Sequence, residues 1–384
     1  MSTVKIDGKG ELGFYIGQEG KNILAPLDAV LNLFAISNAQ MIGPTFDMLI
    51  MDGSGAILNP MPADGMRIQV VIGDAKSEPQ KLDFRCVGSP VAVSTPQGSA
   101  VRISATLNRP KLYHSVCQKA VRGTSSSAVK QIAEECGLFV GDNVDSSVSD
   151  EMTWLPAGRK YSYFLANIAS HGWFGDESAA SKVAVTLDGE VRYKDLAKLA
   201  RRPPVKEFYY GVEIPEGKKG LAYTVHDMML EDLSTTGISL QGYTVKRTRF
   251  GIDGTLESFD VTKVTQNNES LDVSERMRKE VGMGSVILGA PDCGNTHKFF
   301  EQAEYQNSRY RPTFSRRVSV ATLEQTEGVD LYDPVLLHYL DIKTGEPLAR
   351  SGIITAKVLA MVNGFYVERF NIDYQGEDAE IITG

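Results

Sequence analysis

The side chains that could bind a metal ion are dispersed along the chain. Its five histidines and four cysteines form no HExxH, HxH or CxxC motif. The histidines are His114, His171, His226, His297 and His338. Protein metal sites take their ligands from such short motifs or assemble them through the fold. The sequence therefore predicts ordinary histidines and no metal site, with a site assembled only by the fold as the alternative.

Acidic residues offer two candidate carboxylate pairs. Glu134 is adjacent to Glu135, and Asp227 lies close to Glu231 and Asp232. An acid–base pair of the glycosidase type would need two such carboxylates flanking a sugar. Neighbouring acids on a helix more often form a solvated face, so we expect these residues to face solvent.

Other catalytic signatures are incomplete. The glycine-rich residues 282–289 lack the Lys-Ser/Thr that completes a phosphate-binding loop, and the sequence has no G-x-S-x-G motif. The basic residues Lys246, Arg247 and Arg249 are typical of a solvated strand face, with an acidic partner or passing DNA as the alternative. The sequence predicts no catalytic residue, no cofactor and no enzymatic activity.

Bulk composition indicates a folded protein of several domains. A chain of 384 residues is long enough for roughly two to three domains of about 150 residues. Its composition, 42% hydrophobic and 23% charged, is ordinary for a folded protein. The net charge of −8 argues against a general nucleic-acid-binding surface, but it is compatible with a channel that lets DNA pass.

The sequence predicts synthesis in a reducing cytoplasm and no direct membrane insertion. Residues 1–7 lack the apolar segment of a signal peptide, and no apolar run approaches the ~20 residues that span a bilayer. Cys86, Cys117, Cys136 and Cys293 are expected to be reduced thiols, although Cys117 and Cys136 are close enough in sequence to form a disulfide.

Hydrophobic periodicity changes along the chain. Short alternating segments between turns at 45–52, 66–74, 82–87 and 100–107 predict an antiparallel barrel or sandwich, whereas 27–39 fits a short helix or a strand.

Residues 127–136 and 161–171 predict two helices, and 183–189 predicts a strand and turn. The first helix is expected to be capped by Ser125, Ser126 or Ser127 and to end at Gly137. Residues 201–204 mark a boundary because they contain two prolines.

The remaining residues predict strands at 206–214 and 240–250, a short helix at 227–233, an exposed loop at 270–285 and a helix at 299–311.

The last part of the chain repeats the strand order of the first. The matched segments are 330–339 with 64–71, 352–358 with 82–87, and 364–372 with 98–107. The match lies in strand order and turn position rather than in identity. We therefore expect an α+β, mainly β fold of two similar antiparallel β-barrels with two smaller α/β insert domains. The predicted divisions are 1–110 for the first barrel, 111–203 for a mixed α/β domain, 204–250 plus 312–376 for the second barrel, and 251–311 for the smaller insert.

Three motifs in a fixed order carry a family resemblance. The first is Trp154-Leu155-Pro156-Ala157-Gly158 between two helices, followed by a strand and Tyr193-Lys194-Asp195-Leu196. The second is Ala303-Glu304-Tyr305-Gln306-Asn307-Ser308-Arg309-Tyr310. The third is Leu331-Tyr332-Asp333-Pro334-Val335, with Arg350-Ser351-Gly352-Ile353-Ile354 and a closing hairpin. Pro334 departs from the usual glycine-containing turn. From about residue 110 onward the chain resembles the central hub proteins of contractile bacteriophage tail baseplates, which are related to the hub module of type VI secretion spikes.

The resemblance implies a structural protein of the virion that is assembled in the host cytoplasm. It implies a homotrimer whose six barrels face the hexameric tail tube, while the other side presents threefold symmetry to a trimeric spike. Other baseplate proteins would be further partners, and DNA would pass through the lumen. A duplicated subunit reconciles sixfold with threefold symmetry. The alternatives are a hub-like tail-tip protein of a non-contractile phage, which the chain's end at Gly384 disfavours, and a β-rich cell-wall-binding or hydrolytic protein.

The candidate contact residues lie on strands rather than at a catalytic centre. Two strands, 46–50 and 318–323, are expected to be sheet edges that meet neighbouring barrels. The residues chosen on this basis are Phe46, Ile50, Arg316, Arg317, Val318 and Val320. Charge reversal at Arg316 and Arg317 is expected to weaken ring or tube docking.

Overall fold

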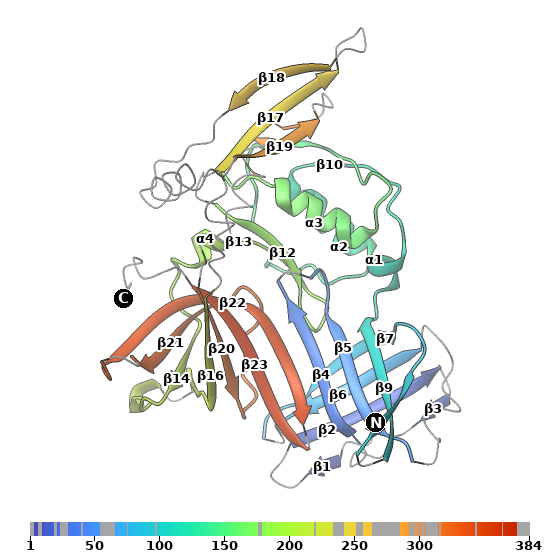
Figure 1. Ribbon diagram of the computed structural model, residues 1–384, viewed down its shortest axis with the longest axis vertical. Coiled ribbons are helices and arrows are strands. Elements are labelled where there is room, and N and C mark those ends of the chain that lie inside the picture. The colour runs from blue at the N-terminus through green and yellow to red at the C-terminus, as the bar shows by residue number, and fades with distance from the viewer. Residues whose placement is uncertain are drawn as a thin grey trace.

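The computed structural model arranges the chain as two barrel-like β units side by side, with an α/β domain against both and a small sheet at the far end (Figure 1). It describes residues 4–6, 10–18, 21–23, 30–39, 41–53, 66–74, 76–96, 98–175, 179–218, 220–232, 242–250, 256–262, 285–291, 296–297, 299–300, 303, 314, 316–341, 344–362 and 364–374. None of the helices within these ranges has the length and apolar character needed to cross a membrane.

The first unit is an antiparallel sheet with the order β1-β2-β6-β7-β9-β5-β4. Its strands are β1 (Val4–Ile6), β2 (Gly10–Gln18), β3 (Lys21–Ile23), β4 (Val30–Asn38), β5 (Thr45–Met51), β6 (Arg67–Gly73), β7 (Gln80–Cys86), β8 (Val91–Thr95) and β9 (Gly98–Leu107). The ambiguous segment 27–39 therefore contains a strand. Alternate residues point inward because side chains alternate across a strand, and Phe46 stacks on Phe84 with ring centroids 5.0 Å apart.

In the second unit, one continuous extended segment pairs first with one strand and then with another, and so joins the two ends of the series of neighbouring strands. It contains β14 (Lys206–Tyr210), β15 (Ala222–Thr224), β16 (Asp227–Asp232), β20 (Arg316–Thr322), β21 (Pro334–Leu340), β22 (Pro347–Val362) and β23 (Phe365–Tyr374), with a 3-10 turn at Glu216–Lys218. Hydrogen-bonded neighbours run β15-β14-β21-β22-β23-β20-β16. β15 continues into β16 through Val225 and His226, whose amides donate to Tyr209 on β14 and Ala321 on β20, respectively. The neighbours therefore lead all the way around the unit.

The short helix predicted at 227–233 is wrong, because its described part is strand β16. The strand forms instead because its backbone groups pair with β20 from Asp227 opposite Ala321 to Asp232 opposite Arg316. Residue 233 lies outside the described residues.

The predicted repeat is present in the strand order. β6-β7-β9-β5-β4 in the first unit and β21-β22-β23-β20-β16 in the second follow the same antiparallel sequence of neighbours. β6 and β21 each have seven residues, and β9 and β23 each have ten. The two units therefore share one architecture, as the matched segments predicted.

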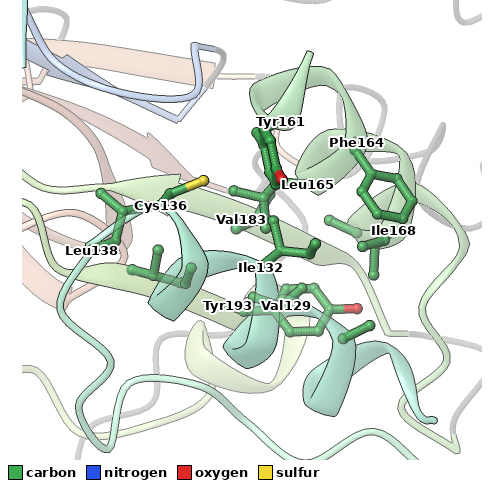
Figure 2. Packing of buried hydrophobic residues seen from close by; sticks show 14 of the residues in the cluster. Val129, Ile132, Cys136, Leu138, Tyr161, Phe164, Leu165, Ile168, Val183 and Tyr193 are labelled. Atoms are coloured by element: carbon green, nitrogen blue, oxygen red, sulfur yellow. The ribbon is translucent and has the colours of Figure 1, made fainter. Parts of the chain in front are cut away.

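The α/β domain packs helices α2 and α3 with two short two-stranded sheets, one formed by β10 and β11 and the other by β12 and β13. Its elements are α1 (Pro110–His114), β10 (Val121–Gly123), α2 (Ser125–Glu135), β11 (Met152–Trp154), α3 (Tyr161–His171), β12 (Ser181–Val185), β13 (Val191–Asp195) and α4 (Leu196–Leu199). Figure 2 shows Val129 and Ile132 of α2 packed with Phe164 and Ile168 of α3.

Helix α2 begins and ends at residues with favourable capping chemistry. Thr124, rather than one of the predicted serines, caps α2 by accepting a hydrogen bond from the Ser127 amide. Gly137 follows the helix with φ of 71°, the predicted left-handed stop.

A third sheet contains β18, β17 and β19 in that order. Its strands are β17 (Gly242–Phe250), β18 (Leu256–Thr262) and β19 (Ser285–Pro291). β17 was predicted to belong to the second barrel, and that assignment is wrong, because it pairs with β18 and β19 instead. Most of the predicted loop at 270–285 and helix at 299–311 lies outside the described residues.

The β12–β13 hairpin contributes side chains to three hydrophobic cores. Leu187 in its turn belongs to the first unit's core, Val185 to that of the α/β domain, and Ala184 to that of the second unit. The hairpin therefore fixes the α/β domain against both barrel-like units.

Truncating Leu187 to Ala is expected to reduce the free energy of unfolding by roughly 2–3 kcal/mol, because it leaves a cavity where the hairpin enters the first core. Urea denaturation monitored by fluorescence measures the change. Leu155→Ala, at a side chain that is 54% exposed, is the matched control and should change stability by less than about 0.5 kcal/mol. Equal effects of the two variants would contradict the role given to Leu187.

Candidate assembly surfaces

The two strands predicted to be edges lie inside their sheets. β5 has β4 on one side and β9 on the other, and β20 lies between β16 and β23. Phe46 and Ile50 on β5 are buried in the first core. Val318 and Val320 on β20 are buried in the second core. The edge assignment is therefore wrong, since alternation along one strand reveals which residues point inward and not which strands flank it.

Arg317 is engaged within its own barrel. Its Nε donates to Asp373 Oδ1 at 2.6 Å, and its Nη2 donates to Asp373 Oδ2 at 3.0 Å. The Asp373 side chain is fully buried. Two parallel hydrogen bonds make this a bidentate pair, which is the strong geometry for a guanidinium and a carboxylate. Arg317 therefore stabilises the fold, while Arg316 beside it is partly exposed.

Several strands pair on one side only in the part of the chain that the structure describes, and β8 and β16 are two of them. β8 pairs with β9 alone, and β16 pairs with β20 alone. Both carry exposed apolar side chains: Val91 is 59% exposed, Met229 55% and Leu230 42%. Unpaired edges with apolar residues are sites where another strand adds.

Sequence reasoning missed both edges, although each left a signal. Residues 91–95 read Val-Ala-Val-Ser-Thr, which is typical of a strand, and residues 228–230 read Met-Met-Leu between acids.

The two units meet at one strand pairing within the chain. β4 pairs antiparallel with the second half of β22, from Asn38 opposite Ala356 to Asn32 opposite Val362. The first half of β22 pairs with β21, so this long strand belongs to both units. Leu359 and Met361 of β22 consequently lie in the first unit's core.

A buried arginine joins the α/β domain to the second unit. Arg192 on β13 donates to the Leu331 carbonyl at 2.7 Å and to Asp333 at 2.9 Å. Its Nε donates to Glu190 at 3.2 Å. Burial alone would lower the pKa of Arg192, but Asp333, Asp330 and Glu190 raise it above its usual value. The guanidinium therefore stays charged and fixes the angle between domain and barrel.

Aromatic stacking attaches Phe299 and Phe300 to the α/β domain. Phe300 stacks on His171 at 4.0 Å between ring centroids, and Phe299 stacks on Trp173 at 4.6 Å. His297 is buried, with its Nε2 2.8 Å from the carbonyl oxygen of His171. Both histidines therefore take part in the packing between the α/β domain and these aromatic residues.

Most acidic residues considered for catalysis have structural partners or lie on a sheet edge. Glu135 accepts hydrogen bonds from Lys111 at 2.8 Å and Tyr161 at 2.9 Å, and Lys111 holds its pKa below the usual value. Glu134 faces solvent as expected, and Asp227 lies on the edge strand β16.

The most deeply buried carboxylate of the α/β domain also has a structural role. Asp150 accepts hydrogen bonds from the Ser125 amide and hydroxyl at 3.2 and 2.5 Å, and from the Trp173 amide at 3.0 Å. It therefore holds the first turn of α2 against the end of α3.

The residues that could bind a metal or react as thiols are not grouped in the described ranges. No group of three His, Cys, Asp or Glu side chains suited to a metal ion lies within them. Cys86, Cys117 and Cys136 are buried free thiols, so the predicted option of a Cys117–Cys136 disulfide is not realised. Burial raises the pKa of Cys136 to about 12, which keeps this thiol protonated. Cys293 lies outside the described residues.

This architecture is the fold of phage tail proteins. The chain is similar over 94% of its length to the 43 kDa tail protein of prophage MuSo2 from Shewanella oneidensis, with a TM-score of 0.56, 11% identity and 98% of that chain covered. It is similar over 95% of its length to the tail protein from Neisseria meningitidis MC58, with a TM-score of 0.52, 13% identity and 97% of that chain covered. The resemblance inferred from the three motifs is confirmed at the level of the fold.

A weaker similarity, with a TM-score of 0.45 and 10% identity, links 95% of this chain to 77% of an Escherichia coli component of the type VI secretion system. A score this low carries no further conclusion. No protein-family model matches the sequence, and no curated protein sequence matches it.

Proposed function

We propose that this chain is a non-enzymatic structural hub of a phage tail baseplate. Three copies would form a ring of six barrel-like units that joins the hexameric tail tube to the trimeric spike and surrounds the DNA exit channel. The observation that carries the proposal is the duplicated strand order, β6-β7-β9-β5-β4 and β21-β22-β23-β20-β16, within one chain. The fold shared with two phage tail proteins supports it.

The duplication would allow the hub to join two structures of different symmetry. A sixfold tube presents six equivalent subunits and a threefold spike presents three, so the subunits of the two cannot pair one to one. A subunit with two similar units offers six similar surfaces on one side of a trimer and three on the other. The α/β domain and the β17–β19 sheet occur once per chain, so they would give the spike side its threefold character (Figure 1).

The channel would suit DNA passage without binding it. The chain has 48 acidic and 40 basic residues, and a wall that is acidic overall repels the phosphate backbone rather than retaining it. The protein would reside in the virion after assembly in the host cytoplasm, with the tube, spike and other baseplate proteins as its partners.

Native mass spectrometry tests the trimer directly. We expect a species of three times 42.0 kDa, alone or after addition of the candidate spike. A turbidity assay on purified cell walls, which should show no clearing, tests the non-enzymatic role. A monomer under both conditions, or cell-wall clearing by the chain, would contradict the proposal.

A further inference from the structure

The contact between the two units of one chain joins two strand edges. At this contact, β4 uses the edge that β5 does not occupy, and the second half of β22 uses the edge that β23 does not occupy. Both edges are thereby satisfied, and the two units share a continuous sheet.

Each strand of this contact has a counterpart in the other unit. β4 ends the first series of neighbours as β16 ends the second, since β4 pairs with β5 and β16 with β20. The second half of β22 forms a hairpin with β23, and β8 forms the equivalent hairpin with β9. The hairpins match residue for residue, with Val362 opposite Phe365 in one and Thr95 opposite Gly98 in the other.

The counterparts β16 and β8 each pair on one side only among the described residues, β16 with β20 and β8 with β9. They belong to different units, so one chain presents β16 from its second unit and β8 from its first. Two different edges that fit each other make a head-to-tail contact, which closes into a ring when the rotation allows.

We propose that β16 of one copy pairs antiparallel with β8 of the next copy, repeating the β4–β22 junction between chains. This inference rests on the proposed hub function and adds the strands and register that would build its ring. Where Phe34 lies opposite Ala360 within the chain, Met229 would lie opposite Val93 of the next copy. Where Ala35 lies opposite Leu359, Leu230 would lie opposite Ala92 of the next copy.

The side chains at the proposed contact fit this register. The Ala35–Leu359 pair places a small residue opposite a large one in the buried face of the intrachain junction. Leu230 opposite Ala92 would again place a large residue opposite a small one, with the large residue on β16 and the small one on β8. Leu230 and Met229 are exposed in the isolated chain, so pairing would remove apolar surface from water.

Engineered disulfides test the register of the proposed pairing between β16 and β8. The Ala39 amide donates to the Thr355 carbonyl, so this pair is hydrogen-bonded and every second pair along the junction is too. Phe34 and Ala360 lie five pairs away and form a non-hydrogen-bonded pair, in which Cα atoms are about 4.5 Å apart, within the range a disulfide spans. Met229→Cys with Val93→Cys in one chain, in a Cys293→Ser background, should therefore give a covalent trimer on mild oxidation.

Met229→Cys with Ala92→Cys is the matched control, because residue 92 points to the opposite face of β8. It should give little covalent trimer. Met229→Asp should convert trimer to monomer in native mass spectrometry, whereas Leu155→Asp, at an equally exposed apolar residue of the α/β domain, should leave the trimer intact.

The outcomes separate this inference from the proposed function. A native trimer that resists Met229→Asp and does not cross-link through residues 93 and 229 would overturn the strand pairing and leave the hub function standing. A chain that stays monomeric with its spike present would overturn both. Equal cross-linking by the pair and by its control would also overturn the register.

Discussion

Replacing Arg317 by Glu will destabilise the second barrel before it affects any assembly. The guanidinium of Arg317 forms two hydrogen bonds to Asp373, whose side chain is fully buried. Losing the positive partner of a buried ion pair costs about 3–5 kcal/mol, and the substituted carboxylate adds repulsion. We expect a loss near the upper end of that range, measured by chemical denaturation. The sequence-based expectation that reversing this charge would weaken docking therefore confuses folding with assembly.

Two further variants test this explanation. Arg317→Met together with Asp373→Leu should recover most of the stability, because an apolar pair of similar volume needs no counter-charge. Arg316→Glu should cost less than Arg317→Glu, since it is Arg317 that pairs with the fully buried Asp373. Equal stability of the Arg316→Glu and Arg317→Glu variants would contradict a large contribution of the buried Arg317–Asp373 pair to the free energy of unfolding.

The second large effect is expected at Glu368, on the buried face of β23. Its carboxylate lies 3.1 Å from Lys357 Nζ and accepts hydrogen bonds from the Thr326 amide and hydroxyl at 2.6 and 2.8 Å. Glu368→Gln keeps an acceptor for Thr326 but removes the negative charge beside Lys357. Because Lys357 is itself almost fully buried, we expect a loss of about 3 kcal/mol in the free energy of unfolding at neutral pH.

The pH dependence of this loss has a defined sign. Burial lowers the pKa of Lys357, but Glu368, Asp330 and Asp333 hold it above its usual value in the native chain. When Glu368 is replaced, the lowering of the pKa of Lys357 by burial should exceed the raising by the remaining carboxylates. The pKa of Lys357 in the folded variant should then fall below its pKa in the unfolded chain. The folded variant then binds fewer protons than its unfolded state, so its stability rises with pH.

Denaturation of both proteins at pH 7 and at about pH 10 measures this dependence. The gap between wild type and Glu368→Gln should narrow at the higher pH, because the variant gains stability as its folded-state Lys357 loses the proton, while the wild type keeps the Lys357 contribution below the ordinary lysine value of 10.5. A gap that stays constant or widens would show that the charge of Lys357 is not the cause.

The barrel architecture followed from local patterns in the sequence. Alternation at 45–52 and 66–74 predicted β5 and β6, and helical periodicity at 161–171 predicted α3 with the bounds it has. Turn positions revealed the repeat, because hairpin geometry depends on residues that are close in sequence. These features are local, so a single sequence carries them.

The assembly surfaces could not be predicted from the sequence, because the neighbours of a strand are set by pairings between residues that are distant in sequence. Phe46 and Val320 were selected because their strands were expected to be sheet edges, yet both side chains are buried in the cores. Residues 227–233 were predicted to form a short helix, and only the pairing with β20 determines the strand over 227–232. The free edges of β8 and β16 emerge only from the complete strand order.

The central claim is that one duplicated chain adapts threefold to sixfold symmetry, and electron microscopy of the purified chain with its candidate spike and tube proteins tests it most directly. We predict a threefold ring of six barrel-like units around a lumen, with the tube on the face where the six units are equivalent. Single, unassociated chains with both partners present, or a ring in which each chain contributes one unit, would contradict it.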